Sequence, residues 1–346
     1  MTNDTTLSRP DVNIQRLAQI FWGFAPSLIV ETGVRLRIFD ILDSGAKTIA
    51  EVAEETAASE RGLRSLLNAL TGLGLLAKTS RERYSLTPES ETFLVSTRPG
   101  YHGGFIRQVR DSFIPTWMDL AEVVQTGKPR AASMNAEKGG VEFFQNFVED
   151  LFPVSYAAAQ AFARSLNLST RRQTTYALDI ACGSGVWGIA LAQESEHVRV
   201  TGVDWPGVLP VTRRTTEKFH VADQFEFIGG DILEADFGAG YEVATLGHIL
   251  HSEGEARSRE LLKKVYTALA PGGTIAIADM LPNEERTGPP FPLIFSLVML
   301  LGTDAGDTYT FEEIQQWLTE AGFVEARTMP SPSVSPLIVA RKPFGA

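Results

Sequence analysis

The sequence becomes glycine-rich at Leu178-Asp-Ile-Ala-Cys-Gly-Ser-Gly-Val-Trp-Gly188, between a predicted strand and a predicted helix. Gly183 and Gly185 permit a tight turn and let the backbone approach a bound molecule closely. Gly188 permits close packing of the helix on the strand. Because the helix begins directly after the loop, its free backbone N–H groups favour an anionic group of a ligand. The stretch therefore predicts a cofactor-binding loop.

Two cofactors are compatible with this loop. The spacing Gly183-x-Gly185-x-x-Gly188, with Asp204 about 20 residues on, is also the dinucleotide fingerprint, in which the loop holds the pyrophosphate of NAD. S-adenosylmethionine instead has a carboxylate, an ammonium and a sulfonium. Asp179 at the strand end would repel a pyrophosphate and attract the ammonium. The sequence thus favours S-adenosylmethionine, although an Asp here can also simply cap its own loop.

Two further Asp residues follow predicted strands. Asp204 ends the run Thr201-Gly-Val-Asp204, where a carboxylate can accept hydrogen bonds from both ribose hydroxyls. Asp231 follows the next apolar run and can accept from the adenine amine or stabilise its own turn. Ligands of open α/β sheets bind at the carboxyl ends of the strands. Three Asp residues at three successive strand ends are therefore stronger evidence than any one of them.

Short apolar runs bounded by turn residues recur through the C-terminal half, as expected of strands that are covered on both faces. Helical stretches separate them, which is typical of a Rossmann-like, doubly wound and mostly parallel α/β sheet. The predicted strands are 177–181, 198–203, 224–228, 243–246 and 274–278, with two later strands at 324–328 and 335–340.

The N-terminal part has a winged-helix pattern. Thr48-Ile-Ala-Glu51 is a capping box that opens a helix. A second helix from about residue 60 to 73 has leucines at helical spacing, and two short strands with a charged turn follow by about residue 86. Residues 41–100 contain seven basic and eight acidic side chains, 7 − 8 = −1. DNA affinity depends on phosphate contacts, so we expect dimerisation, supported by the apolar stretch 21–30, and no nucleic-acid binding.

Composition excludes several further classes of protein. The chain has 346 residues, which suggests two domains, and 31 basic against 42 acidic residues, a net charge of −11. An acidic chain is a poor binder of nucleic acid or anionic membranes. The single cysteine, Cys182, excludes an internal disulfide. The longest strongly apolar run, 291–302, is too short to span a bilayer, and the polar N-terminus is unlike a signal peptide. We expect a cytoplasmic protein with no membrane partner.

From about residue 16 to 343 the chain resembles the dimeric S-adenosylmethionine-dependent small-molecule O-methyltransferases, which include plant caffeate and flavonoid enzymes and bacterial natural-product enzymes. It departs by having Ala181 and Cys182 where the family usually has glycines, and both are small enough for the turn. The matching stretches are Leu178–Gly185, Gly202-Val-Asp204-Trp-Pro206, Gly230-Asp231-Ile232, His248-Ile-Leu-His251, Leu269-Ala-Pro-Gly-Gly273, Thr310-Phe-Glu-Glu to Ala321-Gly-Phe323, and Gly127-Lys-Pro129 to Gly140-Val-Glu-Phe-Phe144.

The resemblance implies a homodimer in which the partner chain helps to wall each active site. It implies a winged-helix dimerisation domain at 16–100, interdomain helices that contribute to the acceptor pocket at 101–168, and a cofactor-binding catalytic domain at 169–346. The expected cofactor-binding residues are Asp179, Gly183, Gly185, Asp204, Trp205, Asp231, Ile232 and His248.

Methyl transfer to a phenol needs a group that removes the hydroxyl proton, and histidine is suited to this near neutral pH. His248 and His251 follow the fourth predicted strand, and the resemblance assigns the base to His251, with His248 against the cofactor. In the family, acidic side chains at two positions of the chain orient the base. Asp279 lies one residue from one of these positions, and Thr308 occupies the other. The family also has Asp-Trp directly after the base, where this chain has Ser252-Glu253.

Other readings of the two histidines remain open. Both can be structural, or the His-x-x-His spacing can bind a metal ion. No third ligand is evident nearby except Glu253 or Glu255, so we expect no metal site.

The apolar stretch 289–301 matches the segment that lines the acceptor pocket in the family, and Phe113, Trp117 and Phe152 are candidate aromatic walls. Apolar pockets suit flat or greasy ligands. We therefore expect methyl transfer from S-adenosylmethionine to a hydroxyl of an aromatic or polyketide-like small molecule, with His251 and Asp279 as catalytic residues. The alternatives are a C-methyltransferase on the same scaffold, a ligand-sensing winged-helix regulator, which the neutral N-terminal part disfavours, and an NAD oxidoreductase, which Asp179 disfavours.

Overall fold

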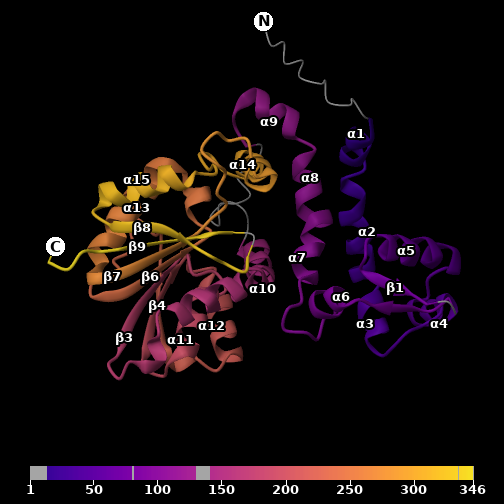
Figure 1. Ribbon diagram of the computed structural model, residues 1–346, viewed down its shortest axis with the longest axis horizontal. Helices are drawn as coiled ribbons and strands as arrows, with labels where there is room; N and C mark the ends of the chain where they lie inside the picture. Colours follow the sequence, from indigo (N-terminus) through magenta and orange to yellow (C-terminus); the bar gives the residue numbers. More distant parts are fainter. Residues whose placement is uncertain (1–13, 80–81, 130–140, 334, 346) are drawn as a thin grey trace, which may run out of the picture. The chain divides into compact units, whose positions relative to one another are not determined.

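The computed structural model describes residues 14–79, 82–129, 141–333 and 335–345 (Figure 1). The chain forms two compact units that divide between Phe113 and Ile114. The segment 101–168, expected to be interdomain, thus has residues in both units, and the division into three parts stays a prediction.

The N-terminal unit consists of helices and one hairpin. In the hairpin β1 and β2 run antiparallel, with Leu76 opposite Leu86. The sequence α4–α5–β1–β2 confirms the predicted helix, helix and wing. The elements are α1 Ile14–Phe21, α2 Phe24–Arg35, α3 Ile38–Asp43, α4 Ile49–Thr56, α5 Glu60–Gly72, β1 Leu76–Lys78, β2 Tyr84–Leu86, α6 Pro88–Phe93, α7 Gly103–Gln108 and the π-helical turn η1 Val109–Phe113.

Helix α4 begins where its capping box predicts. The Thr48 hydroxyl accepts from the backbone N–H of Glu51 at 3.3 Å, and the Glu51 carboxylate accepts from the backbone N–H of Thr48 at 2.6 Å. Arg83 of the wing donates to the same carboxylate at 2.8 Å. The cap therefore also ties the start of α4 to the hairpin.

Apolar side chains lie exposed along α1 and the start of α2. By length and composition alone, residues 14–35 could cross a membrane, although such a helix near the N-terminus is weak evidence of a span. Its second half contains a buried charge, because Glu31 is 2% exposed and accepts from Arg35 at 2.6 Å. An exposed apolar helix face is also typical of a protein–protein interface. The exposed residues are Ile14, Leu17, Ile20, Phe21, Trp22 and Phe24.

The C-terminal unit is built on a seven-stranded sheet of order β5-β4-β3-β6-β7-β9-β8. Strands β3 to β7 run parallel, and β9 pairs antiparallel with both β7 and β8. The predicted doubly wound, mostly parallel fold is confirmed. The elements are α8 Ile114–Trp117, α9 Leu120–Thr126, α10 Val141–Ser165, η2 Leu168–Thr170, β3 Thr175–Ile180, α11 Val186–Glu194, β4 Val198–Asp204, α12 Leu209–Lys218, η3 Ala222–Gln224, β5 Phe225–Gly229, β6 Tyr241–Gly247, α13 Leu250–Ala268, β7 Leu269–Ala278, α14 Pro290–Gly302, α15 Phe311–Ala321, β8 Val324–Met329 and β9 Leu337–Arg341.

Helices cover both faces of this sheet (Figure 1). Helices α13 and α15 pack on one face through residues such as Leu262 and Trp317. Helices α10 and α11 pack on the other through residues such as Phe162 and Ile189. The chain goes outward from β3 to β4 and β5, then returns to place β6 on the other side of β3. Such a reversal of strand order opens a crevice at the carboxyl ends of the strands, where α/β proteins bind ligands.

Candidate active site

The chemistry-bearing residues follow five neighbouring parallel strands. In sheet order, Asp231 follows β5, Asp204 ends β4, Asp179 lies near the end of β3, His248 follows β6 and Asp279 follows β7. Because the carboxyl ends of parallel strands meet at one edge of a sheet, the fold places the predicted cofactor and catalytic residues along a single edge.

Asp179 is buried beneath the glycine loop, with 1% of its surface exposed. One carboxylate oxygen accepts from the backbone N–H of Gly188 at 2.9 Å and the other from the Thr245 hydroxyl at 2.8 Å. Burial raises the pKa of Asp179 to about 7, against the opposing effect of these hydrogen bonds. Asp179 therefore holds the first turn of α11 on the sheet and places a buried carboxyl beneath the glycine loop.

The glycine loop is a cradle that side chains would fill. Gly183 and Gly185 have φ of +55° and +79°, in the left-handed region. A Cβ on Gly185 would lie 2.9 Å from the Thr212 side chain. Asp204 closes the cradle, because its carboxylate accepts from the backbone N–H groups of Gly183 and Trp205, each at 2.7 Å. Burial raises the pKa of Asp204 to about 6.

Asp231 stabilises its own turn by accepting from the backbone N–H of Leu233 at 2.7 Å. It also forms an ion pair with Arg257 of α13 at 2.8 Å. Ile232 beside it is buried in the sheet core, and Trp205 packs partly buried against the cluster that contains Val208. Arg257 is not among the residues that the sequence predicts for the site. The four-residue spacing of Glu253 and Arg257 is a local signal that could have indicated their ion pair, whereas the contact of Arg257 with Asp231 depends on the tertiary fold.

His251 and Asp279 form a buried pair. The His251 Nδ1 atom lies 2.7 Å from a carboxylate oxygen of Asp279, and the backbone N–H of His251 donates to the other oxygen at 3.2 Å. Burial alone would raise the pKa of Asp279, but the neighbouring His251 outweighs it and holds this pKa below its ordinary value. An ionised carboxylate can only accept, so Nδ1 carries the proton. Within the described part of the chain, the Nε2 atom has no hydrogen-bond partner.

His248 joins three segments, and both of its ring nitrogens have serine partners. Its ring nitrogens lie 3.5 Å from the Ser155 hydroxyl of α10 and 2.8 Å from the Ser335 hydroxyl before β9. Burial lowers the pKa of His248 to about 4, so this ring is neutral at pH 7. The two histidine rings are 6.4 Å apart, and no group of three His, Cys, Asp or Glu side chains in the described residues is placed to hold a metal ion.

An aromatic wall covers His251 from α14. The Phe295 ring meets the His251 ring edge to face, with centroids 5.0 Å apart, and Phe291 lies next to it at 5.9 Å, half-exposed. The loop after α14 is tied to the backbone of His251, because Asp307 donates its backbone N–H to the His251 carbonyl at 2.9 Å. Thr308, at the family's second acidic place, is fully buried, and its hydroxyl has no partner among the described residues.

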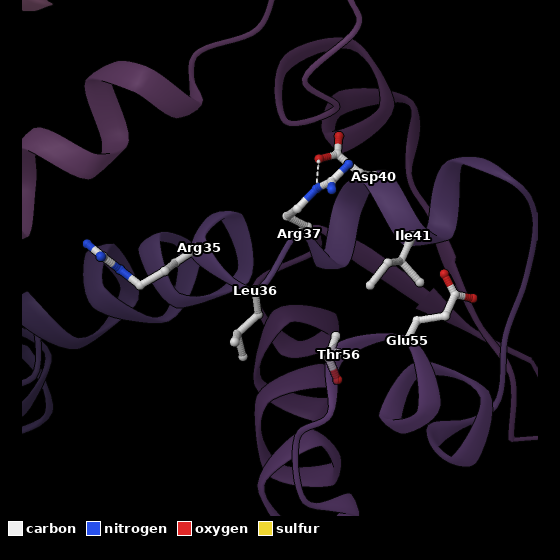
Figure 2. Close-up of a pocket in the computed structure, with 7 residues that line it drawn as sticks. All are labelled: Arg35, Leu36, Arg37, Asp40, Ile41, Glu55 and Thr56. Atoms are coloured by element: carbon white, nitrogen blue, oxygen red, sulfur yellow. Dashed lines mark hydrogen bonds and ion pairs between the residues drawn. The ribbon is translucent and has the colours of Figure 1, made fainter.

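A hollow of about 400 Å³ in the N-terminal unit contains none of the predicted site residues (Figure 2). Its charged side chains are already paired: Arg35 with Glu31, Arg37 with Asp40, and Glu55 with Lys47. We assign it no part in the chemistry. Its lining residues are Arg35, Leu36, Arg37, Asp40, Ile41, Glu55 and Thr56.

Comparison with known families agrees with this geometry. An O-methyltransferase dimerisation domain matches residues 18–96, and an O-methyltransferase domain matches residues 117–324, which is more than half of the chain. This chain belongs to the O-methyltransferase family. It is an S-adenosylmethionine-dependent O-methyltransferase.

Individual relatives of this O-methyltransferase are moderately similar. The tetracenomycin polyketide synthesis 8-O-methyl transferase TcmO of Streptomyces glaucescens is 29% identical, over 99% of this chain and 100% of that protein. The 3-hydroxy-5-methyl-1-naphthoate 3-O-methyltransferase of Streptomyces sahachiroi is 30% identical, over 87% and 85%. Human N-acetylserotonin methyltransferase, solved in complex with S-adenosylmethionine, is 23% identical with a TM-score of 0.83, over 97% and 99%, and shares the fold.

Proposed function

We propose that this O-methyltransferase methylates a phenolic hydroxyl of an aromatic, polyketide-like small molecule, with His251 as general base. The His251–Asp279 pair carries this proposal. With its proton on Nδ1 directed at Asp279, the imidazole keeps its Nε2 lone pair for the acceptor's hydroxyl proton. The ionised Asp279 then stabilises the imidazolium that forms. The edge-to-face Phe295 keeps the ring in place and water away.

The glycine loop and its carboxylates fit S-adenosylmethionine. The cradle leaves no room for a side chain at Gly185, and Asp179 and Asp204 suit a cation and hydroxyl donors better than a pyrophosphate. When bound, S-adenosylmethionine supplies an electrophilic methyl group on a sulfonium. The residues of this chain align the acceptor and accept its proton, so much of the acceleration comes from proximity and orientation. The cofactor-binding set we propose is Asp179, Gly183, Gly185, Asp204, Trp205, Asp231, Ile232 and His248.

The acceptor class rests on the apolar helix α14 and on the relatives. The half-exposed Phe291 contacts Phe295, which contacts His251, and such aromatic faces suit a flat ring. TcmO is named for tetracenomycin polyketide synthesis, and the Streptomyces sahachiroi relative for a hydroxynaphthoate.

We further propose a cytoplasmic homodimer. The exposed apolar face of α1 supports dimerisation, and the domain limits 16–100, 101–168 and 169–346 are part of the same proposal.

The acceptor class can be tested with the purified protein. Hydroxynaphthoates and hydroxyanthraquinones are incubated with S-adenosylmethionine, each beside its methyl ether, which has no free hydroxyl. We expect an O-methyl product from at least one phenol and none from its ether, identified by mass spectrometry and NMR. A product methylated on carbon would identify the alternative C-methyltransferase, and turnover of the ethers would contradict hydroxyl methylation.

Binding of S-adenosylhomocysteine should release protons at neutral pH. Burial raises the pKa of Asp179 to about 7 and of Asp204 to about 6, so part of each is protonated in the free enzyme. The homocysteinyl ammonium of this ligand stabilises ionised Asp179, and its ribose hydroxyls donate to ionised Asp204, so both pKa values fall. We expect roughly half a proton released per site at pH 7, with affinity rising from pH 6 to 8. Calorimetry in buffers of different ionisation enthalpy measures this number. Proton uptake, or heat that does not depend on the buffer, would contradict the effect.

A further inference from the structure

Arg257 connects the cofactor edge of the site to the turn that carries His251. Its Nη2 atom donates to both carboxylate oxygens of Asp231, at 3.1 and 2.8 Å. Its Nε atom donates to Glu253 at 2.6 Å. Glu253 lies two residues after His251, whereas Asp231 follows β5 at the cofactor edge. One guanidinium thus holds two carboxylates from separate parts of the site.

The Glu253–Arg257 pair crosses a break in α13. Gly254 has φ of 78° and ψ of 163°, so the turn with His251 is not continuous with the rest of the helix. Only glycine fits at this break, because its φ is positive and a Cβ on Gly254 would lie 2.8 Å from the carbonyl oxygen of Ala305. The backbone ladder of the helix therefore does not fix the turn, and a side-chain tie across the break constrains it.

Arg257 also determines how Asp231 meets a ligand. A carboxylate offers about four lone-pair positions. The Leu233 N–H and the guanidinium together account for three, two on Oδ1 and one on Oδ2. One position on Oδ2 is left for an outside donor such as an adenine amine. Because Asp231 is held from two sides, its plane is set before the ligand arrives, and preorganised contacts bind more tightly.

We infer that Arg257 is a positioning residue that orients Asp231 toward the cofactor and, through Glu253, steadies the His251 turn. This inference rests on the proposed function, since the role of Asp231 in cofactor binding is part of that proposal. It predicts that two substitutions separate the effects. Arg257→Met affects both cofactor binding and turnover, whereas Glu253→Gln affects turnover alone.

The chain offers a matched control two residues on. Arg259 lies on the same helix and also pairs with two carboxylates, Glu255 and Glu320, neither of which we place at the cofactor or the base. Arg257→Met should raise the dissociation constant of S-adenosylhomocysteine and the KM for S-adenosylmethionine about tenfold and lower kcat severalfold. Arg257→Lys should recover part of the affinity, because an ammonium keeps the positive charge but not the planar, forked arrangement of N–H donors. Arg259→Met should change neither constant more than twofold.

Calorimetry with S-adenosylhomocysteine, steady-state kinetics and melting temperatures separate the outcomes. An unchanged dissociation constant in Arg257→Met, while Asp231→Asn weakens binding, would overturn the positioning role alone. Unchanged binding in Asp231→Asn would overturn the proposed cofactor role of Asp231 instead. Equal losses in Arg257→Met and Arg259→Met would show a general effect on stability and also overturn the inference. A lower kcat in Glu253→Gln with unchanged binding would support it.

Discussion

Replacing His251 with alanine should reduce methyl transfer by about two to four orders of magnitude. The variant has no group to take the hydroxyl proton, because within the described residues the His251 Nε2 atom is the unpaired basic atom beside the Phe295 wall. Binding of S-adenosylhomocysteine should stay within about twofold, since the glycine loop and Asp204 are untouched. Single-turnover rates and calorimetry measure the two quantities separately.

His197→Ala is the matched control for this substitution. The His197 side chain is exposed beside β4, and the backbone carbonyl of His197, which accepts from Thr175, survives the change. Its rate should equal that of the unchanged enzyme. Turnover of His251→Ala within tenfold of the unchanged enzyme would contradict the general-base assignment. Loss of cofactor binding in that variant would mean that the histidine is structural.

Replacing Asp279 with asparagine should lower kcat by about one to two orders of magnitude. The amide oxygen can still accept from His251 Nδ1, but the amide NH₂ then faces the backbone N–H of His251, which now donates to the carboxylate at 3.2 Å. The imidazolium also forms without a counter-charge in a buried site. The KM for S-adenosylmethionine should change little, so steady-state kinetics should show the loss mainly in kcat.

Asp236→Asn provides the comparison for Asp279→Asn. Asp236 is exposed and accepts only from the backbone N–H of Gly238 within the described residues. Its replacement removes the same charge from the chain and should leave kcat unchanged. If Asp279→Asn retained full kcat, Asp279 would not orient or stabilise the base, and the pairing seen in the fold would be structural.

Local sequence was sufficient where the interactions are local. The capping box joins Thr48 to Glu51, three positions on, and it forms as these side chains predict. The positive φ of Gly183 and Gly185 and the tight packing at Gly188 are likewise readable from residue type, because only glycine avoids a Cβ clash there. The alternation of apolar runs and helices also predicted the parallel sheet, because strands that are covered on both faces must be apolar along their length.

The positions of the three carboxylates were also predictable, but their partners were not. Asp179, Asp204 and Asp231 lie at or beside the carboxyl ends of successive strands, and parallel pairing must bring such ends to one edge. Asp179 accepts from Thr245 of β6, and this contact depends on β6 lying beside β3 in the sheet. No short-range pattern encodes this return.

The chain by itself determined the α/β sheet, the winged-helix pattern, the glycine cradle and a histidine at the end of the fourth strand. Tertiary structure decided which groups act together. His251 and Asp279 lie 28 residues apart and meet because β6 and β7 are neighbours, and Arg257 reaches Asp231 across 26 residues. Periodicity reports which face of an element is buried, whereas a hydrogen bond between side chains of different elements depends on strand order and register. The His251–Asp279 pair and the Arg257 bridge are therefore properties of the tertiary fold.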